Sequence, residues 1–348
     1  MATQKQDEQQ KKPRYIVLDI VFYASSLNYD QGSGSYQELK KITQWDGSVK
    51  IMTSRYALRY SILEHAAQAY PNEWKLAGPN ELSTKSKVVQ KAPSTNALDF
   101  PEFDLFGYLI ATKKDNEEVD KEEDKKTKGN KKGKKGNEGQ QEARVSPVKI
   151  SHAISLNSYN FDSHFTANLG MMKRAGETGS NPVNMEEFKG FYVFNVTIDI
   201  NRIGVLDGTS GENNGVRAKR IEYLLKTLMY LKRDIKGKRE DLSPWLVVAG
   251  VYENMNYDTY MDRIELLKSK SHTIKRREKQ TNENGYTVTE VEHQESSDAA
   301  SKPKFKIHEL SANQTIFQRS DIEVDGRKFE ETKKDDFVST LLKKADLK

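Results

Sequence analysis

The sequence contains no cysteine. This absence excludes disulfides, cysteine-ligated zinc, iron–sulfur clusters and thiol catalysis. No hydrophobic run approaches the length of a membrane span, and the opening residues, MATQKQDEQQKKP, are polar throughout. We therefore expect neither a membrane helix nor a secretory signal, and we expect a cytoplasmic protein with no membrane partner.

Motifs of common catalytic and cofactor sites are missing as well. There is no GxxxxGK[ST] phosphate loop, no HExxH metal motif and no GxSxG nucleophile elbow. The six histidines form no cluster at ligand spacing, and GSGS at 32–35 lacks the third glycine of a dinucleotide fingerprint. The sequence predicts no cofactor, no metal site and no enzymatic activity.

Apolar residues are few for a chain of this length. Of 348 residues only 35% are hydrophobic and 31% are charged, with a net charge of +5. The segment 115–144 has equal numbers of acidic and basic side chains, and its only apolar ones are Val119 and Ala143. Such a segment cannot bury enough surface to offset its ordering entropy, so we predict a disordered charged loop over 114–145. The positive excess then lies elsewhere, where a basic groove is possible.

The rest of the sequence predicts a series of strands and helices. Continuous or alternating apolar runs predict strands at 14–23, 148–159, 191–200 and 245–252, and 3.6-residue periodicity predicts helices at 54–69 and 217–234. The order strand, helix, strand, strand, helix, strand predicts an α+β fold of the ferredoxin-like or RRM-like βαββαβ type, built from 14–70, 146–158 and 191–252.

Insertions interrupt this pattern. Prolines and glycines punctuate 71–113, which we interpret as a small lobe in which 104–112 closes as a strand or short helix. The segment 253–348 is interpreted as a C-terminal annex. It contains a predicted hairpin at 271–294 with its turn at Asn284-Gly285, and a short terminal helix marked by Phe337, Leu341 and Leu342.

The stretch 28–60 holds most of the candidate binding residues. Thr53 or Ser54 can cap the helix that follows, and the N-terminus of a helix favours a phosphate. A glycine loop lets a phosphodiester chain approach closely, and arginines four residues apart leave the same helix face. The candidates are Gly32, Gly34, Lys40, Ser54, Arg55 and Arg59. We interpret the stretch as a grip on a nucleic-acid backbone; a surface loop leading into an ordinary solvated helix explains the same spacing.

Two further segments combine positive charge with exposed or flexible chain. The connection 159–190 predicts a hairpin arm with Leu169, Met171, Met172, Lys173 and Arg174, which suits wedging between bases, although the methionines can instead pack on a neighbouring lobe. The predicted loop after residue 234 has a basic cluster around Gly237, which either contacts phosphate or stabilises a helix C-terminus; its members are Lys236, Lys238 and Arg239.

These pieces resemble a known family, the backbone subunit of type I CRISPR Cascade surveillance complexes in the DevR-like branch of the RAMP superfamily. The resemblance covers 14–252, and the pieces that carry it are GSGSYQELKKIT, TSRYALRYSI, DLFGYLIA, VKISHAISLNSYNFDSHFTA, KGFYVFNVTIDINRIG and IKGKREDLSPWLVVAG. It implies an RRM-like palm, a fingers insertion at 71–113 and a thumb hairpin at 159–190. It also implies copies stacked head to tail in a helical filament on a guide RNA (crRNA), which pairs with target DNA in antiviral defence alongside other Cascade subunits.

The resemblance also implies roles for individual residues. It places guide contacts at Ser54, Arg55 and Arg59, thumb contacts at Phe165, Thr166, Met171 and Met172, and phosphate contacts at Lys236 and Lys238. One departure is Tyr56, which stands where the family usually has glutamine and which can stack or hydrogen-bond instead.

Two other functions fit the sequence. Related type III backbone subunits are metal-dependent ribonucleases with an acid in the first loop, and Asp30 would be that acid here. Asp30 can equally be a turn-former, because aspartate bonds its own local backbone in such loops. The third reading is a monomeric RNA-binding regulator.

Overall fold

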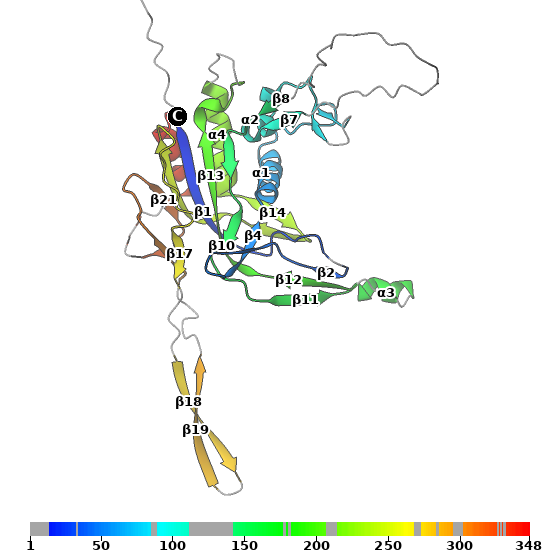
Figure 1. Cartoon of the computed structure of the whole chain (residues 1–348), viewed down its shortest axis with the longest axis vertical. Helices are drawn as coiled ribbons and strands as arrows, with labels where there is room; N and C mark the ends of the chain where they lie inside the picture. Colours follow the sequence, from blue (N-terminus) through cyan, green and yellow to red (C-terminus); the bar gives the residue numbers. More distant parts are fainter. Residues whose placement is uncertain are drawn as a thin grey trace, which may run out of the picture.

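The computed structural model describes residues 14–32, 34–84, 89–110, 142–176, 179, 182–206, 214–267, 273–282, 285–294, 302–325, 327, 329 and 332–348. The chain is a mixed α+β protein with several sheets and few helices, as expected (Figure 1). Most of the segment predicted to be a disordered loop, residues 114–141, lies outside the described residues.

An eight-stranded sheet forms the centre of the molecule. Its order is β21-β16-β1-β13-β10-β4-β3, with β9 also paired to β13. The middle strand β1 (Tyr15–Ser25) is antiparallel to β13 (Lys189–Asp199) on one side and to β16 (Pro244–Tyr252) on the other. These three strands are the near-continuous apolar runs of the sequence, because a central strand is buried on both faces. The remaining strands are β3 (Lys41–Thr43), β4 (Val49–Thr53), β9 (Val148–Ile150), β10 (Ala153–Ser155) and β21 (Thr315–Gln318).

Three helices cover one face of this sheet (Figure 1). They are α1 (Arg55–Ala69), α4 (Asn214–Met229) and α5 (Lys334–Lys344). Leu58, Ile62 and Ala66 of α1 are fully buried in this core, and so are Phe337, Leu341 and Leu342 of α5, which marked the predicted terminal helix. The spacing of these buried residues is that of one face of an amphipathic helix.

The second face of the sheet is covered by the C-terminal segment. Strands β17 (Ile264–Leu267), β20 (Lys304–Ile307) and β22 (Glu323–Val324) form a small sheet whose apolar side chains pack on Val21, Phe191 and Leu246. Because β21 and α5 also join the main sheet and the helical layer, the boundary expected at residue 252 does not separate two cores.

A buried carboxylate holds this segment against the sheet. Asp19 on β1 is 1% exposed and accepts hydrogen bonds from the backbone N of Tyr260 (2.7 Å) and from Nδ2 of Asn195 (2.9 Å). Burial is the largest influence on this group and raises the pKa of Asp19 to about 6, although both hydrogen bonds act in the opposite direction.

The 71–113 insertion contains short elements and a small apolar cluster of its own. These elements are β5 (Leu82–Ser83), β6 (Gln90–Lys91), the 3-10 helix η1 (Ala97–Asp99), α2 (Pro101–Phe106) and β7 (Tyr108–Ile110). Residues 104–112 therefore include both a helix end and a strand, separated by Gly107, whose φ is +69°. A Cβ at Gly107 would lie 2.2 Å from the carbonyl oxygen of Arg144, so the position requires glycine.

One end of the predicted disordered loop is ordered. Residues Glu142–Arg144 form β8, which pairs with β7, so the prediction for 114–145 is wrong over these residues. The reason is Arg144, whose side chain is 2% exposed and forms a 2.6 Å ion pair with Asp104 of α2. A charge count along the sequence cannot show that one arginine of a polar run has a buried partner.

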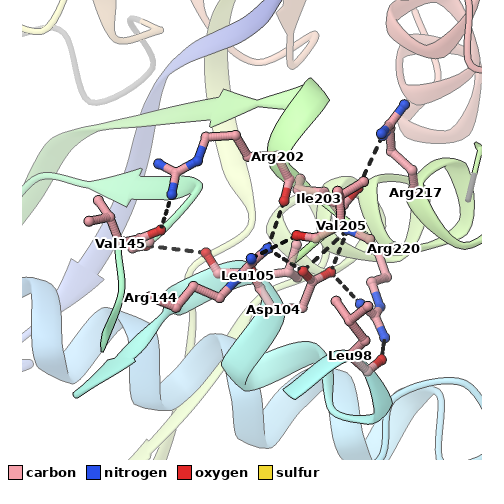
Figure 2. A network of polar contacts seen from close by, with 12 residues as sticks. Leu98, Asp104, Leu105, Arg144, Val145, Arg202, Ile203, Val205, Arg217 and Arg220 are labelled. Carbon is pink, nitrogen blue, oxygen red and sulfur yellow. Dashed lines mark hydrogen bonds and ion pairs between the residues drawn. The ribbon is translucent and has the colours of Figure 1, made fainter. Parts of the chain in front are cut away.

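Asp104 is the centre of a buried polar network that joins the insertion to the main body (Figure 2). Its carboxylate pairs with Arg144 and Arg220 and accepts from the backbone N of Gly204 at 2.9 Å. Arg144 also donates to the carbonyl oxygens of Arg202 (2.6 Å) and Val205 (2.7 Å). Since α2, β8, α4 and the 200–206 turn all meet at one carboxylate, the network fixes the insertion in place.

The predicted helix 217–234 is wrong at both ends. Helix α4 begins at Asn214 and ends at Met229, and 232–235 is strand β14 (Lys232–Ile235), paired with β15 (Lys238–Asp241). The predicted flexible loop after 234 is therefore the tight turn of a hairpin, with Lys236 at φ 51°. Arg233 explains the early end of α4, because its guanidinium bonds the carbonyl oxygens of Leu27 and Ala57 at 3.1 Å each.

Two other strand predictions needed adjustment. The strand expected at 148–159 is divided into β9 and β10 by Ser151, which exchanges hydrogen bonds with the backbone of Asn195. The hairpin expected at 271–294 consists of β18 (Thr273–Asn282) and β19 (Gly285–Gln294). Asn282 pairs with Gly285, so Gly285 begins β19 and is not part of a turn as predicted.

Candidate nucleic-acid interface

The N-terminus of α1 is capped and fixed by neighbouring segments. Ser54 is the N-cap, and its Oγ accepts from the backbone N of Ala57 at 3.2 Å, which confirms the predicted cap. The backbone N of Ser54 donates to Oδ1 of Asn28 (2.9 Å), and that of Arg55 donates to Nδ1 of His152 (3.0 Å). Because the protein itself bonds these donors, the helix end can attract a phosphate mainly through its dipole and its side chains.

The two arginines of α1 rest on different rings. Arg55 is exposed; its Nη2 lies 3.1 Å from the hydroxyl of Tyr56 and its guanidinium 5.0 Å from the centre of that ring. Arg59 is partly buried, with its guanidinium 5.2 Å from the ring centre of Phe106 in α2. Burial lowers the pKa of Arg59, an effect that Glu102 opposes. Arg55 is therefore the more accessible cation.

The glycine loop lies along the hairpin of β11 and β12, called the thumb from here on after its expected role, and does not form an open cradle. Its strand β2 (Tyr36–Gln37) pairs in parallel with β12 (Val183–Glu187), which is itself antiparallel to β11 (Asp162–Thr166). A Cβ at Gly32 would lie 2.5 Å from the carbonyl oxygen of Tyr36, and Gly34 has φ +61°. The conformation of the loop itself therefore explains why glycine occupies both positions.

A buried glutamate joins loop and thumb. Glu186 of β12 is 2% exposed and accepts from Nζ of Lys41 (2.7 Å), the hydroxyl of Tyr36 (3.0 Å) and the backbone N of Leu39 (2.9 Å). Burial alone would raise the pKa of Glu186, but the three hydrogen bonds together lower it. The carboxylate thus stays charged and keeps the base of the thumb against the loop.

The tip of the thumb is a short helix that the sequence analysis did not predict. Helix α3 (Leu169–Ala175) is capped by Asn168 and ends at Gly176, and none of its residues is buried (Figure 1). Its apolar side chains therefore do not pack on another lobe within the part of the chain that the structure describes. Phe165, Leu169 and Met171 are more than half exposed, beside the exposed Lys173, whereas Met172 is half-buried and Thr166 is exposed on β11.

The turn of the β14–β15 hairpin places two lysines at the base of the thumb. Nζ of Lys236 lies 2.6 Å from Oε1 of Gln37 and 5.4 Å from the ring centre of Tyr29. Nζ of Lys238 lies 3.5 Å from Oε1 of Glu187 in β12. Arg239 instead forms a two-pronged ion pair with Asp234 at 2.7 and 2.8 Å. Lys236 and Lys238 are therefore near the thumb, and the charge of Arg239 is balanced.

Residues 26–29 bring the separate candidates together. Asn28 bonds the α1 cap, Tyr29 lies beneath Lys236, and Oγ of Ser26 donates to Glu187 of the thumb at 2.7 Å. The α1 N-terminus, the glycine loop, the thumb base and the β14–β15 turn thus form one continuous region. Sequence reasoning missed the residues that join them, His152, Arg233 and Glu186, because their partners are distant in the chain and no local pattern marks them.

Asp30 lies at the edge of this region. Its Oδ1 is 2.7 Å from Nζ of Lys40 and accepts from the backbone N of Gln31 at 2.9 Å. The hydrogen bond from Lys40 is the main reason why the pKa of Asp30 is lowered. The bond to Gln31 is the local contact expected of a turn-former. Within the described residues, no three histidine, aspartate or glutamate side chains gather as a metal site, and no helix is long and apolar enough to span a membrane.

Comparison with known proteins decides the family. The profile described as "CRISPR-associated negative auto-regulator DevR/Csa2" matches residues 16–263. The chain belongs to this family. The DevR/Csa2 match covers β1 through the segment after β16, which includes every candidate residue discussed above.

The other comparisons are distant. No curated protein matches the chain. Two similar solved structures are described as "CRISPR RNA-guided surveillance complex" and "CRISPR RNA-guided surveillance complex, pre-nicking". Each is 11% identical and covers 68% of this chain, and the match spans 68% and 77% of the respective partner chain, with TM-scores of 0.40 and 0.38.

Proposed function

We propose that this DevR/Csa2-family protein is a backbone subunit of a type I CRISPR Cascade complex that binds guide RNA and has no catalytic role. The observation that carries the proposal is the convergence of the capped α1 N-terminus, the thumb base and the β14–β15 turn on residues 26–29. Together these segments bring positive charge, exposed backbone and, at the end of the thumb, exposed apolar side chains, which suits one single strand that passes over all of them.

The fold supports the same proposal. The strands β16-β1-β13-β10 are antiparallel neighbours, with α1 between β1 and β10 in sequence and α4 between β13 and β16. We assign these elements to a ferredoxin-like, RRM-like palm, with the 71–113 insertion as fingers and 159–190 as thumb. In this assignment Arg55, Lys236 and Lys238 neutralise guide phosphates, and the exposed tip around Phe165 and Met171 separates bases.

The proposed partners are the crRNA, further copies of this chain stacked head to tail, other Cascade subunits and the target DNA that pairs with the exposed guide. The proposed place of action is the cytoplasm, where a guide complex meets invading DNA. The thumb supports self-stacking, because an arm whose tip buries none of its own residues extends away from the sheet (Figure 1).

The test is to purify the full chain from its host with nuclease inhibitors and to determine the mass and sequence of any RNA that co-purifies. We expect repeat-derived RNAs of uniform length, each bound by several copies. An Arg55→Ala, Lys238→Ala double variant should lose most of this RNA, whereas Lys306→Ala, which removes an exposed lysine of β20 on the other face of the sheet, should retain it. Protein without RNA would contradict the proposal.

The same experiment separates a regulator from a backbone subunit, and a cleavage assay separates a ribonuclease. A regulator, a role that the family description names, would carry heterogeneous RNA or one copy per RNA. A ribonuclease would cleave complementary RNA in magnesium and lose this activity in Asp30→Ala. The 2.7 Å contact between Asp30 and Lys40 favours the turn-former over the acid of a metal site, because a carboxylate already bonded to an ammonium is a poorer metal ligand.

A further inference from the structure

Two tyrosines of α1 are exposed without a core role. Tyr56 and Tyr60 are 65% and 60% exposed, and their spacing of four residues places them on the same face of the helix. The opposite face carries the buried residues Leu58, Ile62 and Ala66. Neither tyrosine is therefore needed to hold α1 on the sheet, although each leaves a large ring in water.

Guanidinium groups lie along the same stretch of α1. Arg55 lies against Tyr56, with 5.0 Å from its guanidinium to the ring centre and 3.1 Å from Nη2 to the hydroxyl. The guanidinium of Arg233 bonds Ala57 and Ser61, the residues that follow Tyr56 and Tyr60. The face is thus aromatic and positively charged. Tyrosine and arginine are common both at protein–protein interfaces and in grooves that bind single strands. The face adjoins the proposed RNA-binding region, because the backbone N of Ser54 at the start of α1 bonds Asn28 at 2.9 Å, and this position favours RNA as the ligand.

The helix that carries the pair is rigidly held. Arg233 donates to the carbonyl oxygen of Ala57 (3.1 Å) and to Oγ of Ser61 (2.7 Å), on the turn between the two tyrosines. Asn28 and His152 hold the start of the helix. Because the backbone of α1 is already fixed, stacking of a base on the tyrosines costs little further conformational entropy, and more of the stacking energy contributes to affinity.

We infer that Tyr56 and Tyr60 form a stacking platform for unpaired bases of a single-stranded RNA whose phosphates are neutralised beside it by Arg55. The inference rests on the proposed function and names a contact that it does not include. A tyrosine ring stacks on any base, because every base has a π-face, so the platform suits guides of varied sequence.

The test uses the full chain, with any bound RNA removed, and a single-stranded RNA of mixed sequence that carries 2-aminopurine. The variants are Tyr56→Leu and Tyr60→Leu, with Tyr56→Phe and Tyr60→Phe as matched controls that keep the ring. We expect each Leu variant to lose roughly 5- to 150-fold in affinity, and the quenching of 2-aminopurine to weaken, while the Phe variants bind within about twofold of wild type.

Salt dependence separates stacking from charge. In the Leu variants the slope of log K against log salt should equal that of wild type, whereas Arg55→Ala should make it shallower by about 1. Leu variants that bind like wild type, or Phe variants that lose as much as Leu, would overturn the platform. Loss of self-association in the absence of RNA would assign the rings to a contact between copies and would also overturn it.

Failure of the inference can be told from failure of the proposed function. If wild type shows no salt-dependent RNA binding, the proposed function is wrong and the platform with it. If wild type binds, Arg55→Ala weakens binding and the Leu variants have no effect, the platform alone is wrong.

Discussion

Glu186 of the thumb and Lys41 of β3 form an ion pair with 2.7 Å between Oε1 and Nζ, and the glutamate side chain is only 3% exposed. Leu39 and Tyr36 bond the same carboxylate from the glycine loop. This one carboxylate therefore ties the thumb both to the sheet and to the glycine loop. If the thumb inserts between guide bases, the position of its tip depends on this contact at the base of the thumb.

We predict that Glu186→Ala loosens the thumb. The change leaves Lys41 and the backbone N of Leu39 without their acceptor, which should cost about 2 to 4 kcal/mol locally. Hydrogen exchange should accelerate over 183–187 and 36–39 while β1 and β13 stay protected. Glu186→Gln is the matched control, because it keeps an acceptor for Leu39 and should have a smaller effect. Uniform acceleration across the chain would show that the glutamate supports the whole fold instead.

We predict that the lysines of the β14–β15 turn contribute to salt-dependent RNA binding, and Arg239 much less. Lys236→Ala and Lys238→Ala should each make the slope of log K against log salt shallower by about 1, because each removes one phosphate contact. Arg239→Ala should change it less, since Asp234 already balances that guanidinium. Titration at several salt concentrations measures this, with Lys306→Ala as the unchanged control. Equal slopes in all four variants would place the RNA elsewhere.

We predict that Asp104→Ala detaches the 71–113 insertion. Arg144 and Arg220 would remain buried without their carboxylate, at a cost of about 3 to 5 kcal/mol (Figure 2). Limited proteolysis should then cut at η1, α2 and β8 before it cuts the sheet. The control is Asp99→Ala, an exposed aspartate of η1, which should change stability by less than about 1 kcal/mol. Equal protease resistance in the two variants would contradict the role given to the network.

We predict a pH effect from Asp19. Because its pKa is raised to about 6 in the folded protein, the folded state binds more protons than the unfolded state between about pH 4 and pH 6. The group therefore lowers stability as pH rises through this window, by roughly 3 kcal/mol in total. Unfolding by urea at pH 4, 5, 6 and 7 measures it. Relative to Asp19→Asn, wild type should lose stability with rising pH, and a constant difference between them would refute the assignment.

Local sequence patterns predicted the parts of the fold whose cause is local. The continuous apolar runs of β1, β13 and β16 and the Ser54 cap with its buried stripe are visible without knowledge of any partner. The end of α4 and strand β14 were not predictable, because Arg233 is drawn to Leu27 and Ala57, which are far away in the chain. In the same way β8 depends on the pairing of Arg144 with Asp104.

The candidate site shows the same division. Composition and spacing selected Arg55, Lys236 and Lys238, all of which the structure leaves accessible. They did not show that the glycine loop pairs with the thumb. Strand β2 is only two residues long, and Glu186, which bonds the loop at Leu39, is far away in the sequence. Nor did they show that Arg59 is covered by Phe106 while Tyr60 is left in water.

The position of β1 in the sheet has a consequence for biosynthesis. Its two neighbours are β13, which begins 164 residues after Ser25, and β16, which is made later still. At the usual rate of translation the most apolar strand of the protein leaves the ribosome about ten to thirty seconds before its first partner. A nascent chain in this condition is exposed to aggregation, so chaperone capacity, more than final stability, should limit the yield of this protein in a cell.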